Sequence, residues 1–123
     1  MAFEVECPGE LRRAAEAAIA ASGLKDGHLS VELVDSVRIT ELNREHRGRD
    51  EPTDVLSFPV DGSQPAAGPR ELGDVVICRE YTGDIDEAVV HGVLHLVGYD
   101  HETDSGEMLA LQDRVVADLR ADR

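Results

Sequence analysis

The chain has 123 residues and a formal net charge of −14 at pH 7, with 26 acidic against 12 basic residues. This length suits one domain that buries its own core, and the apolar fraction of 41% is typical of a folded chain rather than a disordered one. A nucleic-acid-binding protein normally carries a basic face, which such a composition disfavours. Two interpretations stay open: a solvating acidic surface, or acid that repels RNA everywhere except at one arginine-lined site.

The sequence shows no sign of export or of membrane insertion. Its apolar runs stay well short of the roughly 18 residues that span a bilayer. Its first residues, MAFEVEC, lack the basic and apolar regions of a signal peptide. We therefore expect a cytoplasmic protein with no membrane partner, in which Cys7 and Cys78 are buried, reduced thiols rather than a disulfide or metal ligands.

The first half of the chain predicts two strands and two helices. Residues 3–7 alternate between apolar and polar and predict a strand, and helical apolar spacing from Leu11 to Ile19 predicts a helix that Gly23 closes. Residues 28–35 alternate again as a second strand. Ser36 is expected to cap a helix that runs to about Arg47.

The second half predicts two more strands and two more helices. Residues 53–60 and 72–78 read as strands joined by a turn-rich loop at 61–70. A helix is expected over residues 84–97, and Asp104 with Glu107 is a capping pair for the last helix. Residues 1–123 thus predict one α+β domain with a small mixed sheet of about four strands and about four to five helices.

Three histidines have the spacing of metal ligands. His91 and His95 lie four residues apart on the penultimate predicted helix, so both imidazoles project from one face and reach one ion. A continuing helix would carry His101 away, but Gly98 can take the positive φ that ends a helix and folds the chain back. Three neutral nitrogens leave a fourth tetrahedral position open, which is typical of catalytic zinc. We therefore predict one zinc ion per chain at the end of this helix, with Asp100 as a supporting residue or a plain turn residue.

The full segment His91 to His101 reads HGVLHLVGYDH. It matches the metzincin metalloprotease pattern HExxHxxGxxH except at the second position, where the protease carries its general base. Here that position is Gly92. The ligand set is kept while the base of the protease is absent, which indicates different chemistry.

Three blocks of the sequence resemble the YbeY family, the bacterial rRNA maturation endoribonucleases. They are HGVLHLVGYDH at residues 91–101, LNREHRGRDEPTDVLSFP at 42–59 and LGDVVIC at 72–78. The resemblance implies a small mixed sheet with helices, and zinc held by His91, His95 and His101. It also implies single-strand-specific RNA cleavage, 16S rRNA 3′-end maturation, ribosome quality control, and contact with the small ribosomal subunit or its proteins.

The second block of the resemblance points to Arg47, since an arginine of that block is implicated in the activity of the family. The sequence departs from the family at two places. His46 stands where a tyrosine is usual, and residues 79–90, between Cys78 and His91, form a shorter segment than is usual. The shorter segment leaves metal binding intact but bears on the wall of the RNA channel.

Arg44, Arg47 and Arg49 form the densest basic cluster of the sequence. A guanidinium binds phosphate in bidentate fashion, and the resemblance selects Arg47 as the catalytic residue among them. The alternative is that these arginines pair with neighbouring carboxylates. Asp54, Ser57 and Asp74 fall in the same blocks but equally suit turns and strand ends, and His28 and His46 have no partner at metal spacing.

Two other functions remain open at this point. One is a metal-dependent hydrolase of peptides or small esters whose base comes from elsewhere in the chain. The other is a non-catalytic ribosome-assembly factor, in which zinc is structural and the acidic surface docks on basic ribosomal proteins.

Overall fold

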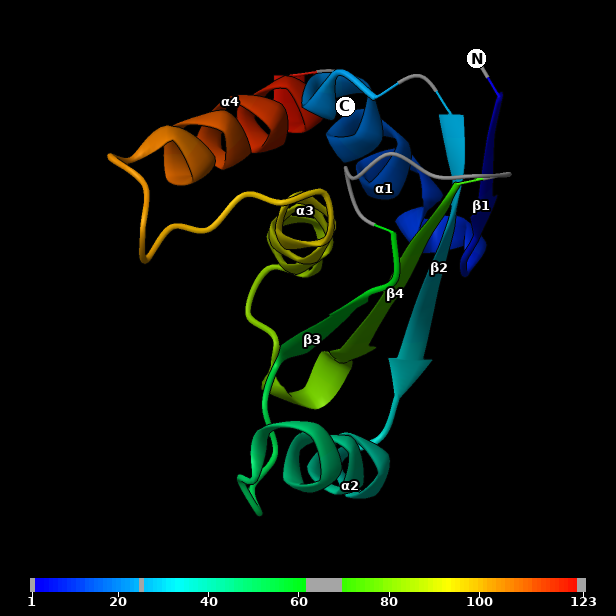
Figure 1. The fold of residues 1–123 in the computed structure, drawn as a ribbon, viewed down its shortest axis with the longest axis vertical. Coiled ribbons are helices and arrows are strands. Elements are labelled where there is room, and N and C mark those ends of the chain that lie inside the picture. Colours follow the sequence, from blue (N-terminus) through cyan, green and yellow to red (C-terminus); the bar gives the residue numbers. More distant parts are fainter. Residues whose placement is uncertain (1, 25, 62–69, 122–123) are drawn as a thin grey trace.

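The computed structural model describes residues 2–24, 26–61 and 70–121. Strands and helices alternate in the first half of the chain, and two further strands are followed by the last helices (Figure 1). In chain order these are β1 (Ala2–Glu6), α1 (Gly9–Ser22), β2 (Asp26–Val34), α2 (Ser36–Arg47), β3 (Val55–Pro59), β4 (Glu71–Cys78), the 3-10 helix η1 (Arg79–Tyr81), α3 (Ile85–Leu96) and α4 (Glu107–Ala121).

The strands form one mixed sheet in the order β1-β2-β4-β3. β1 pairs with β2 and β2 with β4 in parallel, while β3 pairs with β4 antiparallel and forms one edge of the sheet. The predicted α+β class, the mixed sheet and the numbers of strands and helices are confirmed. The edge position of β3 leaves this strand free to border a cleft.

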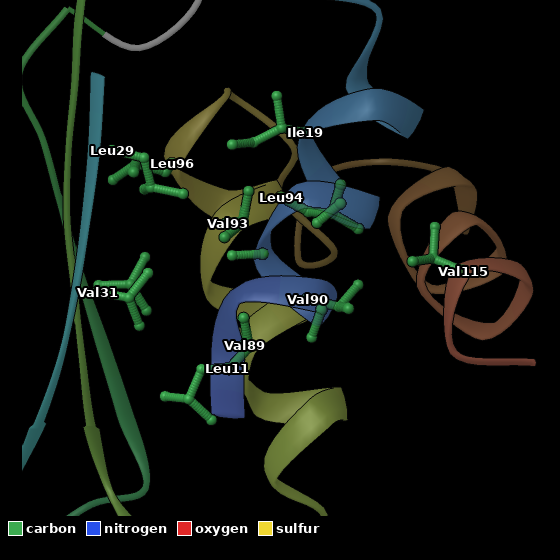
Figure 2. Packing of buried hydrophobic residues seen from close by; sticks show 14 of the residues in the cluster. Leu11, Ile19, Leu29, Val31, Val89, Val90, Val93, Leu94, Leu96 and Val115 are labelled. Carbon is green, nitrogen blue, oxygen red and sulfur yellow. The ribbon is translucent and has the colours of Figure 1, made fainter. Parts of the chain in front are cut away.

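Helix α3 lies in the main core, where it packs beside α1, against β3 and β4 of the sheet and against α4 (Figure 1). Its Val89, Val90, Val93 and Leu94 are fully buried, and Figure 2 shows them among side chains of α1, β2 and α4. A helix buried on most of its surface is held rigidly by packing, since protein interiors are close-packed. The helix that carries two of the candidate ligands is therefore firmly positioned.

The other face of β4 carries a second, smaller core against α2. Side chains alternate along a strand, so Val75 and Ile77 join the main core while Val76 and Cys78 face Ile39 of α2. This second cluster holds α2 against β3 and β4 on this face of the sheet. Cys78 is buried, Cys7 is half-buried, and both are free thiols.

Two helix starts differ in detail from the sequence-based prediction. α2 is capped by Asp35, whose Oδ1 accepts a 2.8 Å bond from the Arg38 N–H, and Ser36 is its first helical residue, because the carboxylate one residue earlier reaches the free N–H groups. At α4, Asp104 accepts from the Met108 N–H at 2.9 Å. Glu107 accepts from the Ser105 N–H at 2.7 Å instead of returning to Asp104. Both carboxylates serve this helix start, but they do not form a reciprocal pair.

Most of the predicted loop at 61–70 lies outside the described residues, which include only Asp61 and Arg70 of it. Within the described ranges, no helix combines the length and the apolar character that crossing a bilayer requires.

Candidate metal centre and its cleft

The three predicted histidine ligands converge at the end of α3. His91 and His95 lie one turn apart, with ring centroids 4.9 Å from each other. His101 follows from the next turn, and its ring lies 5.3 Å from that of His91 and 5.4 Å from that of His95. The three rings therefore lie together in space, as their spacing in the sequence predicts.

The bend that returns His101 is a Schellman motif. Gly98 has φ of 108°, its N–H donates to the His95 carbonyl at 3.1 Å, and the Tyr99 N–H donates to the Leu94 carbonyl at 3.0 Å. Residues other than glycine rarely adopt this φ. Gly98 thus ends α3 and turns the chain so that His101 faces the two helical ligands.

This group fits a metal ion. One ring nitrogen from each histidine can be chosen so that the three atoms lie within 4.8 Å of one another, and no other group of this kind occurs in the described part of the chain. Burial first, and then the rings of His91 and His101, lower the pKa of His95 below its ordinary value of 6.5. His95 is therefore held neutral, which is the form that binds a metal.

Gln112 of α4 contacts one of the three histidines, on the side away from the candidate metal position. This residue was not identified from the sequence. Its Oε1 lies 2.8 Å from Nδ1 of His91, and the residue is only 5% exposed. A visible signal existed in the sequence: Gln112 is a polar residue at a core-facing position of α4, one turn after Met108 and one before Val116. Asp100 accepts a 3.0 Å bond from the Glu102 N–H within its own turn, which matches the plain turn residue among the two roles that the sequence allows.

Gly92 faces the sheet and lets α3 approach it closely. A Cβ atom at this position would lie 2.6 Å from Cγ1 of Val75 and 3.1 Å from Cγ2 of Val55. The carbonyl of Gly92 also accepts a 2.9 Å hydrogen bond from the hydroxyl of Ser57 in β3. The position that carries the base in metzincins is therefore packed against strands here and has no room for a glutamate.

The histidine group opens onto a cleft of about 1210 Å³ that β3, the end of α2, the start of α3 and the start of α4 surround. All of β3 lines it, as do His46 and Arg47 from the last turn of α2. The connection Thr82–Asp84 lines it too. Because the segment between Cys78 and His91 is short, this wall consists of the connection after η1 and the first turn of α3.

Among the clustered arginines, only Arg47 lines the cleft. Arg44 pairs with Asp50 at 3.4 Å and Arg49 with Glu51 at 3.9 Å, as the carboxylate-pairing alternative expected for exposed side chains. Arg47 has no ion pair with any residue in the described ranges. Its guanidinium therefore remains available to a ligand.

Of the remaining sequence candidates, Asp54 and Ser57 line the cleft, while Asp74 and His28 do not. Asp54 accepts a 2.8 Å bond from the Val55 N–H at the start of β3, and Asp74 is an exposed strand residue paired across from Phe58. His28 lies between Glu6 and Glu71 and is not among the residues that line the cleft. His46, by contrast, lies in the cleft beside Arg47.

The model of the Endoribonuclease YbeY family matches residues 4–120 of this chain. The chain belongs to the YbeY family. It is thereby placed among the hydrolytic endoribonucleases, and the family resemblance of the three sequence blocks is confirmed.

Individual relatives support the assignment over different shares of their length. An Endoribonuclease YbeY of Persephonella marina is 42% identical over 108 residues, which cover 76% of this chain and 71% of the relative. One of Symbiobacterium thermophilum is 38% identical over 135 aligned positions, with 92% of this chain and 86% of the relative covered. One of Anaeromyxobacter dehalogenans is 45% identical over 104 residues, but the chain spans only 53% of its length.

A solved structure shows the same fold. The solution structure of a Thermotoga maritima protein superposes with a TM-score of 0.57 at 28% identity, covering 98% of this chain and 93% of that one.

Proposed function

We propose that residues 1–123 form a single zinc-dependent endoribonuclease domain that cleaves single-stranded RNA in the cytoplasm. The observation that carries the proposal is that the histidine group and Arg47, which has no ion pair among the described residues, line one cleft in a chain of the YbeY family. Its substrate is the 16S rRNA precursor near its 3′ end, in maturation and in ribosome quality control, which brings the domain into contact with the small ribosomal subunit.

His91, His95 and His101 are the ligands in this proposal, with one zinc ion per chain. Bound zinc supplies Lewis-acid polarisation of a phosphoryl oxygen. Gln112 orients His91, and the neutral form of His95 is ready to coordinate. Gly98 supplies the turn that brings in the third ligand.

Arg47 is the catalytic arginine. Its guanidinium keeps its charge and donates two parallel hydrogen bonds to a phosphate, so it can stabilise the extra negative charge of the transition state. The net charge of −14 repels RNA from most of the surface. A phosphate is therefore held where Arg47 and a metal ion offset that repulsion.

A cleavage assay on two substrates tests the proposal. Zinc-loaded protein is incubated with a single-stranded RNA and, separately, with casein, beside a His95→Ala variant purified in the same way. We expect cleavage of RNA by the wild type alone and intact casein throughout. Cleavage of casein would instead support a peptide hydrolase, although Gly92 leaves no room for the base of a metzincin. Ribosome association with no cleavage of either substrate would support an assembly factor.

A further inference from the structure

Apart from the metal site, the described residues place one pair of aromatic rings in the cleft. His46, in the last turn of α2, and Phe58, in edge strand β3, have ring centroids 4.8 Å apart and planes inclined by 58°. Both residues line the cleft, and Arg47 follows His46 directly in the chain. The end of α2 and strand β3, which a loop separates in the sequence, thus bring an aromatic pair and a cation together in the cleft.

The two rings differ in how firmly they are held. Phe58 is half-buried and packs against the second core cluster, which contains Ile39, Leu56, Val76 and Cys78. His46 is exposed and rests on Phe58. The Phe58 ring therefore braces one side of His46, while the rest of the imidazole ring is accessible from the cleft.

The charges around the cleft make an uncharged contact valuable for RNA. Five carboxylate residues line it, against the single arginine: Asp54, Asp84, Glu87, Asp100 and Glu102. Electrostatic attraction to phosphates, which supplies most of the affinity of an ordinary nucleic-acid-binding protein, is therefore weak along most of this cleft. Stacking of bases on aromatic rings does not depend on surface charge and tolerates any base.

We propose that the exposed face of His46, braced by Phe58, is a stacking site for one unpaired nucleobase, and that Arg47 holds a phosphate next to that nucleotide. The inference rests on the proposed function, because it names how the RNA substrate is held. It explains how a strongly acidic chain with few aromatic residues binds a single strand. The tyrosine that is usual at the position of His46 would offer a larger ring for the same stacking contact.

Binding of an oligonucleotide that lacks one base at a time tests this site. The probe is a short single-stranded 2′-O-methyl RNA, checked for integrity by gel electrophoresis, in which each nucleotide in turn is made abasic. For the zinc-loaded wild type, we expect one abasic position to weaken binding roughly tenfold, within the range for losing one stacked base. His46→Ala should weaken binding of the intact probe to the same extent and remove the penalty at that position.

Two further variants separate stacking from a general disturbance. His46→Tyr should restore both the affinity and the abasic penalty, because it keeps a ring on Phe58. Tyr81→Ala removes an aromatic side chain that is 51% exposed but does not line the cleft, and it should behave as the wild type. Arg47→Ala should reduce the steepness of log Kd against log salt by about 0.7, the value for one phosphate on a single strand, while His46→Ala should leave that slope unchanged.

The outcomes distinguish this inference from the proposed function. If the wild type cleaves single-stranded RNA but His46→Ala keeps the full abasic penalty, the stacking site is wrong and the endoribonuclease assignment stands. If the wild type neither binds nor cleaves single-stranded RNA, both are overturned.

Discussion

Oε1 of Gln112 lies 2.8 Å from Nδ1 of His91 and so links α4 to the histidine group at the end of α3. An amide oxygen only accepts hydrogen bonds, so this contact requires the proton on Nδ1 and leaves the lone pair of Nε2 free for a metal ion. Because Gln112 is 5% exposed, water does not compete for the contact. The orientation and the tautomer of one ligand are therefore set from a different helix.

Replacing Gln112 should weaken zinc binding without unfolding the protein. Loss of a hydrogen bond behind a metal ligand typically costs 10–100-fold in affinity, so we expect a loss of about that size for Gln112→Leu and near-normal affinity for Gln112→Glu, which keeps an acceptor. Competition with a chromophoric chelator measures the affinity. The exposed neighbour Asp113→Leu is the matched control on α4. Equal zinc affinity of Gln112→Leu and the wild type would show that Gln112 does not position His91.

A side chain at residue 92 should destabilise the fold. Gly92→Ala gains helix propensity of about 1 kcal/mol, but its Cβ would lie 2.6 Å from Val75 Cγ1, and overpacking typically costs about 1–3 kcal/mol. We expect net destabilisation in urea unfolding, and more of it for Gly92→Glu, which should also remain unable to cleave casein. Gly9→Ala in α1 is the control, since its Cβ meets nothing within 4 Å. A Gly92→Ala variant that is more stable than the wild type would mean that α3 does not pack so closely on the sheet.

Arg47 should be needed for cleavage but not for metal binding. Removing one positioned donor to transition-state charge slows catalysis roughly 10²–10³-fold, so we expect this loss for Arg47→Ala in single-turnover cleavage of single-stranded RNA at matched zinc occupancy. Arg47→Lys should rescue poorly, because an ammonium lacks the planar fork. Arg44→Ala is the control, since Arg44 pairs with Asp50 and does not line the cleft. A rate for Arg47→Ala within about threefold of the wild type would contradict the catalytic assignment, since a surface arginine contributes under about 1 kcal/mol to stability and nothing to turnover.

His28 should make stability depend on pH. Its hydrogen bond to Glu71, and more weakly that to Glu6, raise the pKa of His28 above 6.5, although burial acts in the opposite direction. A raised pKa in the folded state means that the stabilisation is complete below about pH 6.5, the pKa in the unfolded chain, and is lost as pH rises through the folded value. We expect the difference in unfolding free energy between the wild type and His28→Asn to shrink from pH 5.5 to pH 8.5. A difference that stays constant or grows over this interval would show that the protonated ring does not tie the three strands together.

The features that were predictable from the sequence are local. The helix around His91 and His95 follows from apolar spacing, and the turn at Gly98 follows from the one residue type that tolerates its φ. The cap of α2 was misplaced by one residue, because Ser36 and Asp35 are both good capping residues and only geometry selects between them.

The features that were missed depend on contacts between distant segments. Gln112 reaches His91 across two helices, and His46 meets Phe58 only because β3 pairs antiparallel with β4 beside the end of α2. The sequence marks such residues only indirectly, as a glutamine within an apolar stripe or an aromatic residue in a strand. Arg47 could be separated from Arg44 and Arg49 by the resemblance, but its lack of an ion pair within the described ranges required the structure.

Titration of the metal-free protein with zinc tests the central claim, that one ion held by three histidines drives RNA cleavage. Metal content and the single-turnover rate on single-stranded RNA are measured together as zinc is added to the wild type, His95→Ala and His101→Ala. We expect the wild-type rate to rise in proportion to bound zinc and to level off at one ion per chain, while both variants bind no tight zinc and stay inactive. Equal zinc stoichiometry in the three proteins, or full cleavage by the metal-free wild type, would contradict it.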